Sequence, residues 1–281
     1  MQPERSATET TLTERLDAPA PLSVRILGAS GGIGPGRRTT SILIDDDVLI
    51  DAGSGVGDLH LEELGGIRHV FLTHSHLDHV AFLPFLIDTV FRVDAPPITV
   101  HALADTLEAL QRHIFNWVIW PDFTALPSPE RPSLRLQTLE PGEAIKLGNR
   151  TVTALPARHT VPAIGYSVVR RNGGAFAFSG DTTSTPSFWE TLNALPSLDL
   201  LMIETGLPDE MDRLAGASRH YTPLQLAHDL GKLVHRPRVA ITHLKPGYEQ
   251  AIRRQLAARD NGDMIVLGGD ERFELQAPAR R

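Results

Sequence analysis

The chain has 281 residues, a net charge of −7 from 27 basic and 34 acidic side chains, and no cysteine. The lack of cysteine excludes disulfides and thiolate zinc sites, so any metal must be held by His, Asp or Glu. The acidic balance and the lack of a dense basic run argue against a nucleic-acid-binding protein. No apolar run approaches the roughly 18 residues that span a bilayer. We expect a flexible polar tail over residues 1–20 and a single domain over 21–281, in a cytoplasmic protein with no membrane contact.

Short apolar runs alternate with helical periodicities along the chain, which indicates an α/β fold. The predicted strands lie at residues 23–27, 41–51 (as a hairpin), 68–74, 96–101, 134–139, 151–155, 164–169, 174–181, 198–204, 237–243 and 263–270. The predicted helices lie at residues 78–91, 104–116, 223–234 and 246–259.

The glycine-rich stretch "GASGGIG", residues 28–34, follows the first predicted strand and is similar to the start of a dinucleotide-binding unit. That unit needs a helix directly after the turn, because the helix N-terminus holds the pyrophosphate. Here Pro35 and Gly36 break any helix, and the hairpin over 41–51 follows. The Gly28–Gly36 loop therefore predicts a turn in which backbone approaches a neighbouring segment closely, and no bound cofactor.

The stretch "THSHLDHV", residues 73–80, has the pattern H-x-H-x-D-H at the end of a predicted strand. His74 and His76 lie two residues apart, so in extended chain they point the same way and can bind one metal ion. Asp78 and His79 fall in the first turn of the next helix and can serve a second ion. This donor set suits zinc, with manganese or iron as alternatives.

Three more candidate ligands stand at or after strand ends. His159 follows the strand over 151–155, Asp181 ends the strand over 174–181, and His243 ends the strand over 237–243. Asp51, which follows the hairpin, is expected to support the metal-binding loop from behind. We expect His101 and His113 to be ordinary surface residues.

In this order the motif, His159, Asp181 and His243 resemble the metallo-β-lactamase superfamily. The resemblance implies a four-layer αββα sandwich with two metal ions in its mouth. It assigns His74, His76 and His159 to one ion, Asp78, His79 and His243 to the other, and a bridging role to Asp181. The segments "FNWVIWPDF" (115–123), "RHYTPLQLAHDLGKL" (219–233) and "THLKPGYEQAI" (242–252) are similar to class II cyclic-nucleotide phosphodiesterases. That family hydrolyses small 3′,5′-cyclic nucleotides, cAMP or cGMP, to 5′-nucleotides, and the mechanism we expect is attack by a metal-bridging hydroxide.

The remaining candidates fit phosphate chemistry. Thr222 is a good N-cap, so His220 lies beside a helix N-terminus, where anions bind readily. Glu204, at the end of the strand over 198–204, can accept a proton from His220, whose other nitrogen then serves the substrate. A purely structural Glu204–His220 hydrogen bond is the alternative. The candidate catalytic residues are Asp78, Glu204 and His220, and the candidate substrate contacts are Trp117, Trp120, Thr222 and Lys245.

Two other activities of the same fold stay open. An endonuclease that trims tRNA 3′ ends shares the metal pattern and a Glu–His pair, but it needs a basic arm that this chain lacks. A thioester or lactone hydrolase would not need His220 at a helix start. Base preference, metal identity and oligomeric state are not fixed by the sequence, although the aromatic-rich segment over 115–123 is compatible with a homodimer.

Overall fold

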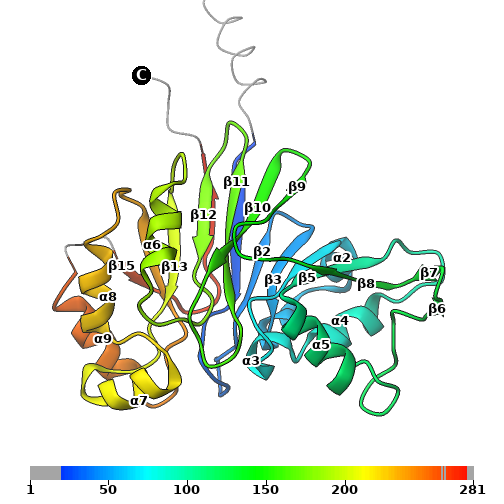
Figure 1. Ribbon diagram of the computed structural model, residues 1–281, viewed down its shortest axis with the longest axis horizontal. Helices are drawn as coiled ribbons and strands as arrows, with labels where there is room; N and C mark the ends of the chain where they lie inside the picture. Colours follow the sequence, from blue (N-terminus) through cyan, green and yellow to red (C-terminus); the bar gives the residue numbers. More distant parts are fainter. Residues whose placement is uncertain (1–19, 261, 263, 277–281) are drawn as a thin grey trace, which may run out of the picture.

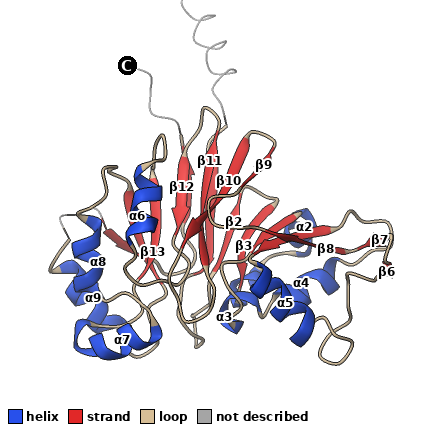
Figure 2. Cartoon of the chain, viewed as in Figure 1, coloured by secondary structure: helices blue, strands red, loops and turns tan. Residues whose placement is uncertain are grey.

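The computed structural model describes residues 20–260, 262 and 264–276. Nearly all of the expected 1–20 tail lies outside these residues. Two seven-stranded sheets face each other, and helices cover the outer face of each (Figures 1 and 2). The predicted four-layer αββα sandwich is confirmed. No helix in the described part of the chain is both long and apolar enough to cross a membrane.

The first sheet has the strand order β16-β1-β2-β3-β4-β5-β8. Its strands are β1 (Leu22–Gly28), β2 (Ser41–Ile44), β3 (Val48–Ala52), β4 (His69–Phe71), β5 (Ile98–Ala102), β8 (Leu134–Thr138) and β16 (Arg272–Leu275). The predicted hairpin is confirmed as β2 and β3, which are paired antiparallel and buried on both faces. From β3 onward the pairing with β4, β5 and β8 is parallel, so the carboxyl ends of these strands meet at one edge.

The second sheet has the order β15-β14-β13-β12-β11-β10-β9. Its strands are β9 (Ala144–Leu147), β10 (Arg150–Pro156), β11 (Ile164–Arg170), β12 (Ala175–Phe178), β13 (Leu200–Glu204), β14 (Arg238–Thr242) and β15 (Met264–Val266). Here β12 to β15 are parallel. A small separate pair, β6 (Pro127–Ser128) and β7 (Arg131–Pro132), lies between α5 and β8.

The helices divide between the two outer faces. They are α2 (Leu61–Gly66), α3 (Leu77–Val80), α4 (Leu83–Val90), α5 (Ala104–His113), α6 (Pro186–Asn193), α7 (Asp212–Ser218), α8 (Pro223–Leu230) and α9 (Glu249–Ala257), with short 3₁₀ turns η1 (Ser54–Asp58) and η2 (Asp209–Met211). The single helix predicted over 78–91 is wrong. Two helices, α3 and α4, replace it, because Pro84 suits a first turn and cannot donate a hydrogen bond inside a longer helix.

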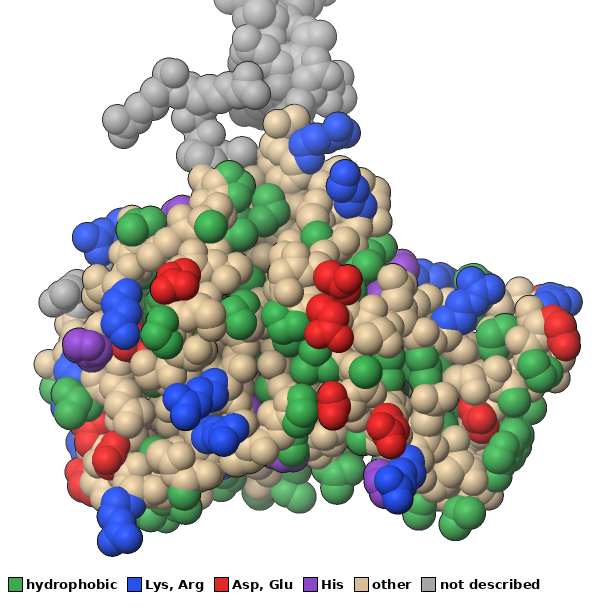
Figure 3. Space-filling view, in the orientation of Figure 1, with side chains coloured by type: hydrophobic (Ala, Val, Ile, Leu, Met, Phe, Trp, Pro, Cys, Tyr) green, Lys and Arg blue, Asp and Glu red, His purple; other side chains and the backbone are tan. Residues whose placement is uncertain are grey.

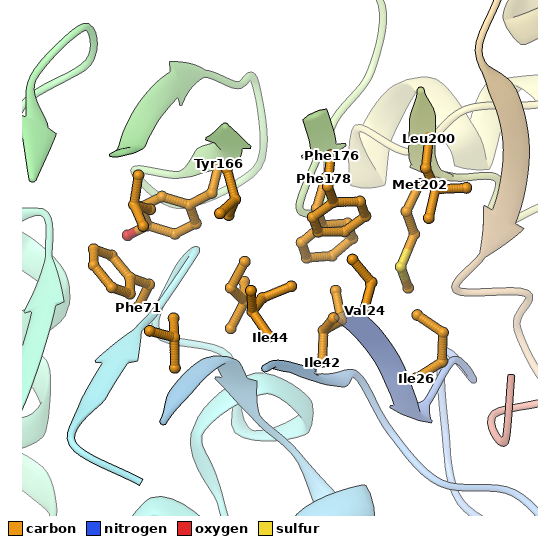
Figure 4. Packing of buried hydrophobic residues seen from close by; sticks show 14 of the residues in the cluster. Val24, Ile26, Ile42, Ile44, Phe71, Tyr166, Phe176, Phe178, Leu200 and Met202 are labelled. Carbon is orange, nitrogen blue, oxygen red and sulfur yellow. The ribbon is translucent and has the colours of Figure 1, made fainter. Parts of the chain in front are cut away.

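The main core lies between the two sheets. Figure 4 shows Val24, Ile26, Ile42 and Ile44 of the first sheet packing toward aromatic side chains of the second, among them Phe176 and Phe178. Two further clusters fill the spaces between each sheet and its outer helices. Burial on both faces of the central strands fixes how the sheets stack, and with it how loops from the two sheets meet at one edge.

Candidate metal centre

The motif loop leaves the carboxyl end of β4. His76 has extended backbone and is the N-cap of α3, so Asp78 and His79 fall in the first helical turn, as the spacing predicts. The tight turn between β4 and α3 therefore brings the polar side chains of the motif close together, with His74 and His76 in one group and Asp78 and His79 in another.

The structure brings the predicted metal ligands together in two groups. The first group is His74, His76, His159 and Asp181, and the second is Asp78, His79, Asp181 and His243; within each group the possible ligand atoms lie within 4.8 Å of one another. Members come from both sheets, after β4, β10, β12 and β14. The two donor sets share one residue, Asp181.

The Asp181 carboxylate stands between the two donor sets. Its Oδ2 lies 3.1 Å from His243 Nε2 and 3.8 Å from His159 Nε2, while its Oδ1 lies 3.4 Å from His79 Nε2. The expectation that Asp181 is the last residue of its strand is wrong, because β12 ends at Phe178. Gly180, in a left-handed conformation with φ of 60°, turns the chain and carries the carboxylate into the centre.

Several buried donor atoms at the centre have no hydrogen-bond partner among the described residues. They include His74 Nε2, His79 Nε2 and Asp181 Oδ1. A buried polar atom without a partner is costly, and here all three atoms face a common space. Imidazole nitrogens around a carboxylate, with no thiolate, match the ligand preferences of divalent zinc, manganese or iron. The residues present therefore fit two divalent ions.

A hydrogen-bond chain behind the motif loop fixes the orientation of two imidazoles. Asp51 Oδ2 accepts a hydrogen bond from His79 Nδ1 at 2.7 Å, and Thr73 donates to the same carboxylate through its Oγ1 at 2.9 Å. Thr73 Oγ1 in turn lies 2.9 Å from His74 Nδ1, from which it can accept. The Nδ1 atoms of both histidines are thus engaged behind the loop, and both Nε2 atoms face the centre. The predicted supporting place of Asp51 is confirmed, whereas sequence analysis missed Thr73.

Burial and charge set the protonation of the centre. Burial lowers the pKa of His74 and His243 well below the ordinary value, so both imidazoles are neutral and offer a lone pair. Burial alone would raise the pKa of Asp181, but the imidazoles around it outweigh that effect and hold the pKa of Asp181 well below its usual range. One of them is His79, whose own pKa is raised well above the ordinary value by Asp181 and Asp51 in spite of burial. Asp181 is therefore an anion surrounded by histidines, which is the charge state of a metal ligand.

Glu204 and His220 form the predicted pair beside the two donor sets. Glu204 is the last residue of β13, and His220 Nδ1 donates to its Oε1 at 2.7 Å. The His220 ring centre lies 5.0 Å from that of His159 and 5.2 Å from that of His243. Burial lowers the pKa of His220, but the Glu204 carboxylate outweighs burial and raises it above the ordinary value. His220 can thus carry a proton next to the donor sets.

The candidate substrate contacts lie in different surroundings. Lys245 Nζ is 3.0 Å from His243 Nε2, at the centre itself. Thr222 is the N-cap of α8 as predicted, and its hydroxyl accepts from the backbone of Gln225 at 3.4 Å. Trp117 and Trp120 lie in the turn after α5; Trp117 is 62% exposed, and Trp120 packs edge-on against Phe85 at 5.1 Å between ring centres. Lys245 is the candidate whose charge the structure places among the donors.

The glycine loop lies against the segment that carries His243. His243 N donates to Ala29 O at 2.8 Å, and Gly31 N donates to Leu244 O at 3.1 Å. A Cβ at Gly31 would lie only 2.6 Å from His243 O. The interpretation of this loop as a turn of close backbone approach is confirmed.

The expectation that His101 is a surface residue is wrong. His101 is 1% exposed, its ring stacks on Phe71 at 4.3 Å, and its Nε2 lies 3.0 Å from His69 Nδ1. His113, the other residue in that expectation, is exposed.

The fold and the two donor sets define a hydrolase of the metallo-β-lactamase fold, a class that works with divalent metal ions. A family model described as "Beta-lactamase superfamily domain" matches residues 47–258, and the chain belongs to this superfamily. A probable 3′,5′-cyclic-nucleotide phosphodiesterase of Yersinia pestis is 27% identical, over 82% of this chain and 80% of its own length. A ribonuclease Z of Methanosarcina mazei is 22% identical, over 92% of this chain and 99% of its own.

Solved structures agree on the fold. The metallo-β-lactamase fold protein YhfI from Bacillus subtilis has a TM-score of 0.73 at 19% identity, covering 91% of this chain and 100% of that one. Unliganded yeast PDE1 has a TM-score of 0.70 at 20% identity, covering 88% of this chain and 97% of that one. At such identities the likeness shows the fold alone.

Proposed function

We propose that this chain is a phosphodiesterase with two divalent metal ions that hydrolyses 3′,5′-cyclic nucleotides, cAMP or cGMP, to 5′-nucleotides. The observation that carries the proposal is the Glu204–His220 pair, joined at 2.7 Å, directly beside the two donor sets that share Asp181. A phosphodiester needs cations to balance its charge and a proton donor for its leaving oxygen; the donor sets would hold the cations, and His220 beside them can serve as the proton donor. Relatives named cyclic-nucleotide phosphodiesterases support the choice.

The two donor sets supply candidate ligands for two ions. His74, His76 and His159 would hold one ion, Asp78, His79 and His243 would hold the other, and Asp181 would bridge them. Zinc is the ion we favour, with manganese or iron as alternatives, because the donors are imidazole and carboxylate. When bound, the two ions supply an acidified water as nucleophile at neutral pH and balance the phosphoryl charge.

The side chains around the two donor sets supply the proton transfer. Glu204 holds the Nδ1–H of His220, so Nε2–H of the imidazolium is the group that can protonate the departing 3′ oxygen. Glu204 outweighs burial and raises the pKa of His220 above the ordinary value, which favours the protonated imidazole. Asp78, whose side chain is 26% exposed, is the least buried member of the second donor set, so its carboxylate oxygen that does not hold an ion would accept a hydrogen bond from water entering the centre.

A tRNA-processing endonuclease is the main alternative, because relatives named ribonuclease Z span most of the chain. Such an enzyme must bind a large polyanion. The segment over 114–133, which extends beside the first sheet, has Arg131 as its only basic residue and also carries Asp122 and Glu130. On the face in Figure 3, Lys and Arg side chains are scattered among acidic ones. These charges favour a small substrate.

A substrate panel tests the proposal. The full-length, metal-loaded protein is assayed against cAMP, cGMP, bis(p-nitrophenyl) phosphate, a tRNA precursor, a thioester and a lactone. We expect 5′-nucleotide from at least one cyclic nucleotide and loss of that activity with a chelator. Hydrolysis restricted to the thioester or lactone, or cleavage of the tRNA precursor alone, would overturn the proposal. Sedimentation of the same sample measures the oligomeric state, which the sequence leaves open.

A further inference from the structure

The ammonium group of Lys245 lies among the donors of the second set. Its Nζ is 3.0 Å from His243 Nε2 and 4.0 Å from Asp78 Oδ2. Asp78 is the one carboxylate within 4.0 Å of this ammonium among the described residues, and Asp78 is itself a candidate ligand. Within the described part of the chain, the ammonium therefore has no counter-ion apart from the metal site.

The neighbouring backbone fixes the path of the Lys245 side chain. Lys245 N donates to Gly206 O at 3.1 Å, which anchors the residue at the base of its side chain. On the other side, a Cβ at Gly31 would lie 3.0 Å from Lys245 Cδ, so the glycine loop leaves just enough room for the stem. The side chain is 30% exposed. It is thus directed over the centre by packing on two sides.

We propose that Lys245 is a fixed third cation of the centre, which weakens retention of the ion at the second donor set and selects anionic over neutral substrates. A positive charge within a few ångströms of a divalent ion raises the free energy of the loaded site. Asp181 belongs to both sets, but Lys245 lies within 4.0 Å of His243 and Asp78, which belong to the second set alone. The ammonium therefore disfavours the second ion more than the first, so the first set fills at lower metal concentration.

An anionic substrate reverses the repulsion. A phosphoryl oxygen placed over the ions also meets the ammonium, which binds phosphate as a point charge. Binding of the anion and of the second ion must then strengthen each other equally, by linkage. A neutral thioester or lactone gains nothing from Lys245. The substrate part of this inference rests on the proposed function, whereas the metal part rests on the donor sets alone.

The metal part is tested by titrating metal-free protein with zinc against a chelating indicator. In Lys245→Met we expect affinity for the second ion to rise about tenfold and affinity for the first to rise by a smaller factor. Lys245→Arg, which keeps the charge, should titrate like the parent protein. The matched control is Lys146→Met, because Lys146 is exposed on β9. Adding inorganic phosphate should tighten the second ion in the parent protein and less so in Lys245→Met.

The direction of the change decides between the proposal and a structural role. If Lys245 only packs the loop, its removal loosens the second ion; an unchanged or weaker second affinity in Lys245→Met would overturn the proposal. If the Met variant does not fold, Lys245→Gln removes the same charge and is titrated in its place, with the same two outcomes.

The substrate part is tested with bis(p-nitrophenyl) phosphate, an anionic diester without a nucleobase. Lys245→Met should raise KM for this diester about tenfold and leave KM for a neutral ester unchanged. An equal rise for both esters would contradict the proposed selection of anions. If the parent protein hydrolyses this diester but no cyclic nucleotide, the proposed function fails while the role of Lys245 stands.

Discussion

Two groups of close histidines lie in this fold, and they differ in their charged neighbours. At the metal centre, imidazoles from both sheets surround Asp181, which has no Lys or Arg partner among the described residues. The second group is the His69–His101 pair, whose ring nitrogens lie 3.0 Å apart. Its neighbouring carboxylate, Asp47, is held by Arg150 at 2.6 Å. The metal site thus differs from the neutral histidine pair in having a carboxylate that no arginine or lysine of the described residues neutralises and that can bind a cation.

The hydrogen-bond partners of the ring nitrogens also differ between the two groups. At the centre, Asp51 holds His79 by Nδ1, and Nε2 is left facing Asp181. In the second group, His69 and His101 satisfy one nitrogen each by bonding to one another. Burial lowers the pKa of His101 to about 4, so this pair carries no charge at neutral pH. Proximity of histidines alone does not make a cation site.

The largest effect is expected from Asp181→Ala, which removes the carboxylate common to both donor sets. Hydrolysis should fall by more than the 10–100-fold typical of residues that only orient ligands, to roughly a thousandth or less, and bound metal should drop with it. Elemental analysis and turnover of a phosphodiester measure the two losses. The matched control is Asp47→Asn, which should leave metal content unchanged. Full metal occupancy in Asp181→Ala would disprove the assignment.

The next effect concerns His220. His220→Ala should lower kcat by about 10²–10⁴-fold while metal content stays at the parent level, because the imidazolium is the proton donor and not a ligand. Activity that needs protonated His220 is lost as pH rises through its pKa. Glu204 raises that pKa, so in Glu204→Gln the basic limb of the kcat profile should move to lower pH. If the basic limb of the kcat profile does not move in Glu204→Gln, the Glu204–His220 hydrogen bond has only a structural role.

A smaller effect is expected from Asp51→Asn, which keeps the shape of the side chain and removes its charge. Asp51 orients His79 directly and His74 through Thr73, and partners of this kind contribute about 10–100-fold to metal affinity. Competition with a chelator should show a loss in this range. A parent-like affinity would mean that packing alone orients the two histidines.

Sequence reasoning locates the centre because its donors follow strands that the apolar pattern marks clearly. The motif over 74–79 is contiguous, β13 and β14 are mostly buried runs, and β10 alternates buried and half-buried residues. The pattern is weaker where burial is slight. Strand β9 alternates exposed and half-buried residues, and in β16 only Phe273 is buried, so the sequence predicts neither strand.

The contacts that sequence could not supply join residues distant in the chain. Thr73 precedes His74 directly, but it can link His74 to a carboxylate only because Asp51, in another strand, lies within hydrogen-bond distance of its hydroxyl. His101 sits on an apolar run in β5, and its burial depends on His69 and Phe71 of the neighbouring strand. Partners of this kind are set by strand register, which a single sequence does not fix.

The smallest effect tests the second histidine group through the pH dependence of stability. Burial lowers the pKa of His101 from the ordinary value of 6.5, which applies in the unfolded chain, to about 4 in the folded protein. Between these two pH values the unfolded chain binds a proton that the folded protein does not, so the free energy of unfolding falls as pH drops from 6.5 toward 4. In His101→Phe, which keeps the stacking on Phe71, the free energy of unfolding should fall about 2 kcal/mol less between pH 7 and pH 5 than in the parent. Urea titrations of both proteins at both pH values give this double difference, in which the titration of the metal-site histidines cancels. Parallel pH profiles would show that His101 takes up a proton in the folded state as easily as in the unfolded chain, and that the pair is not the neutral counterpart of the metal centre.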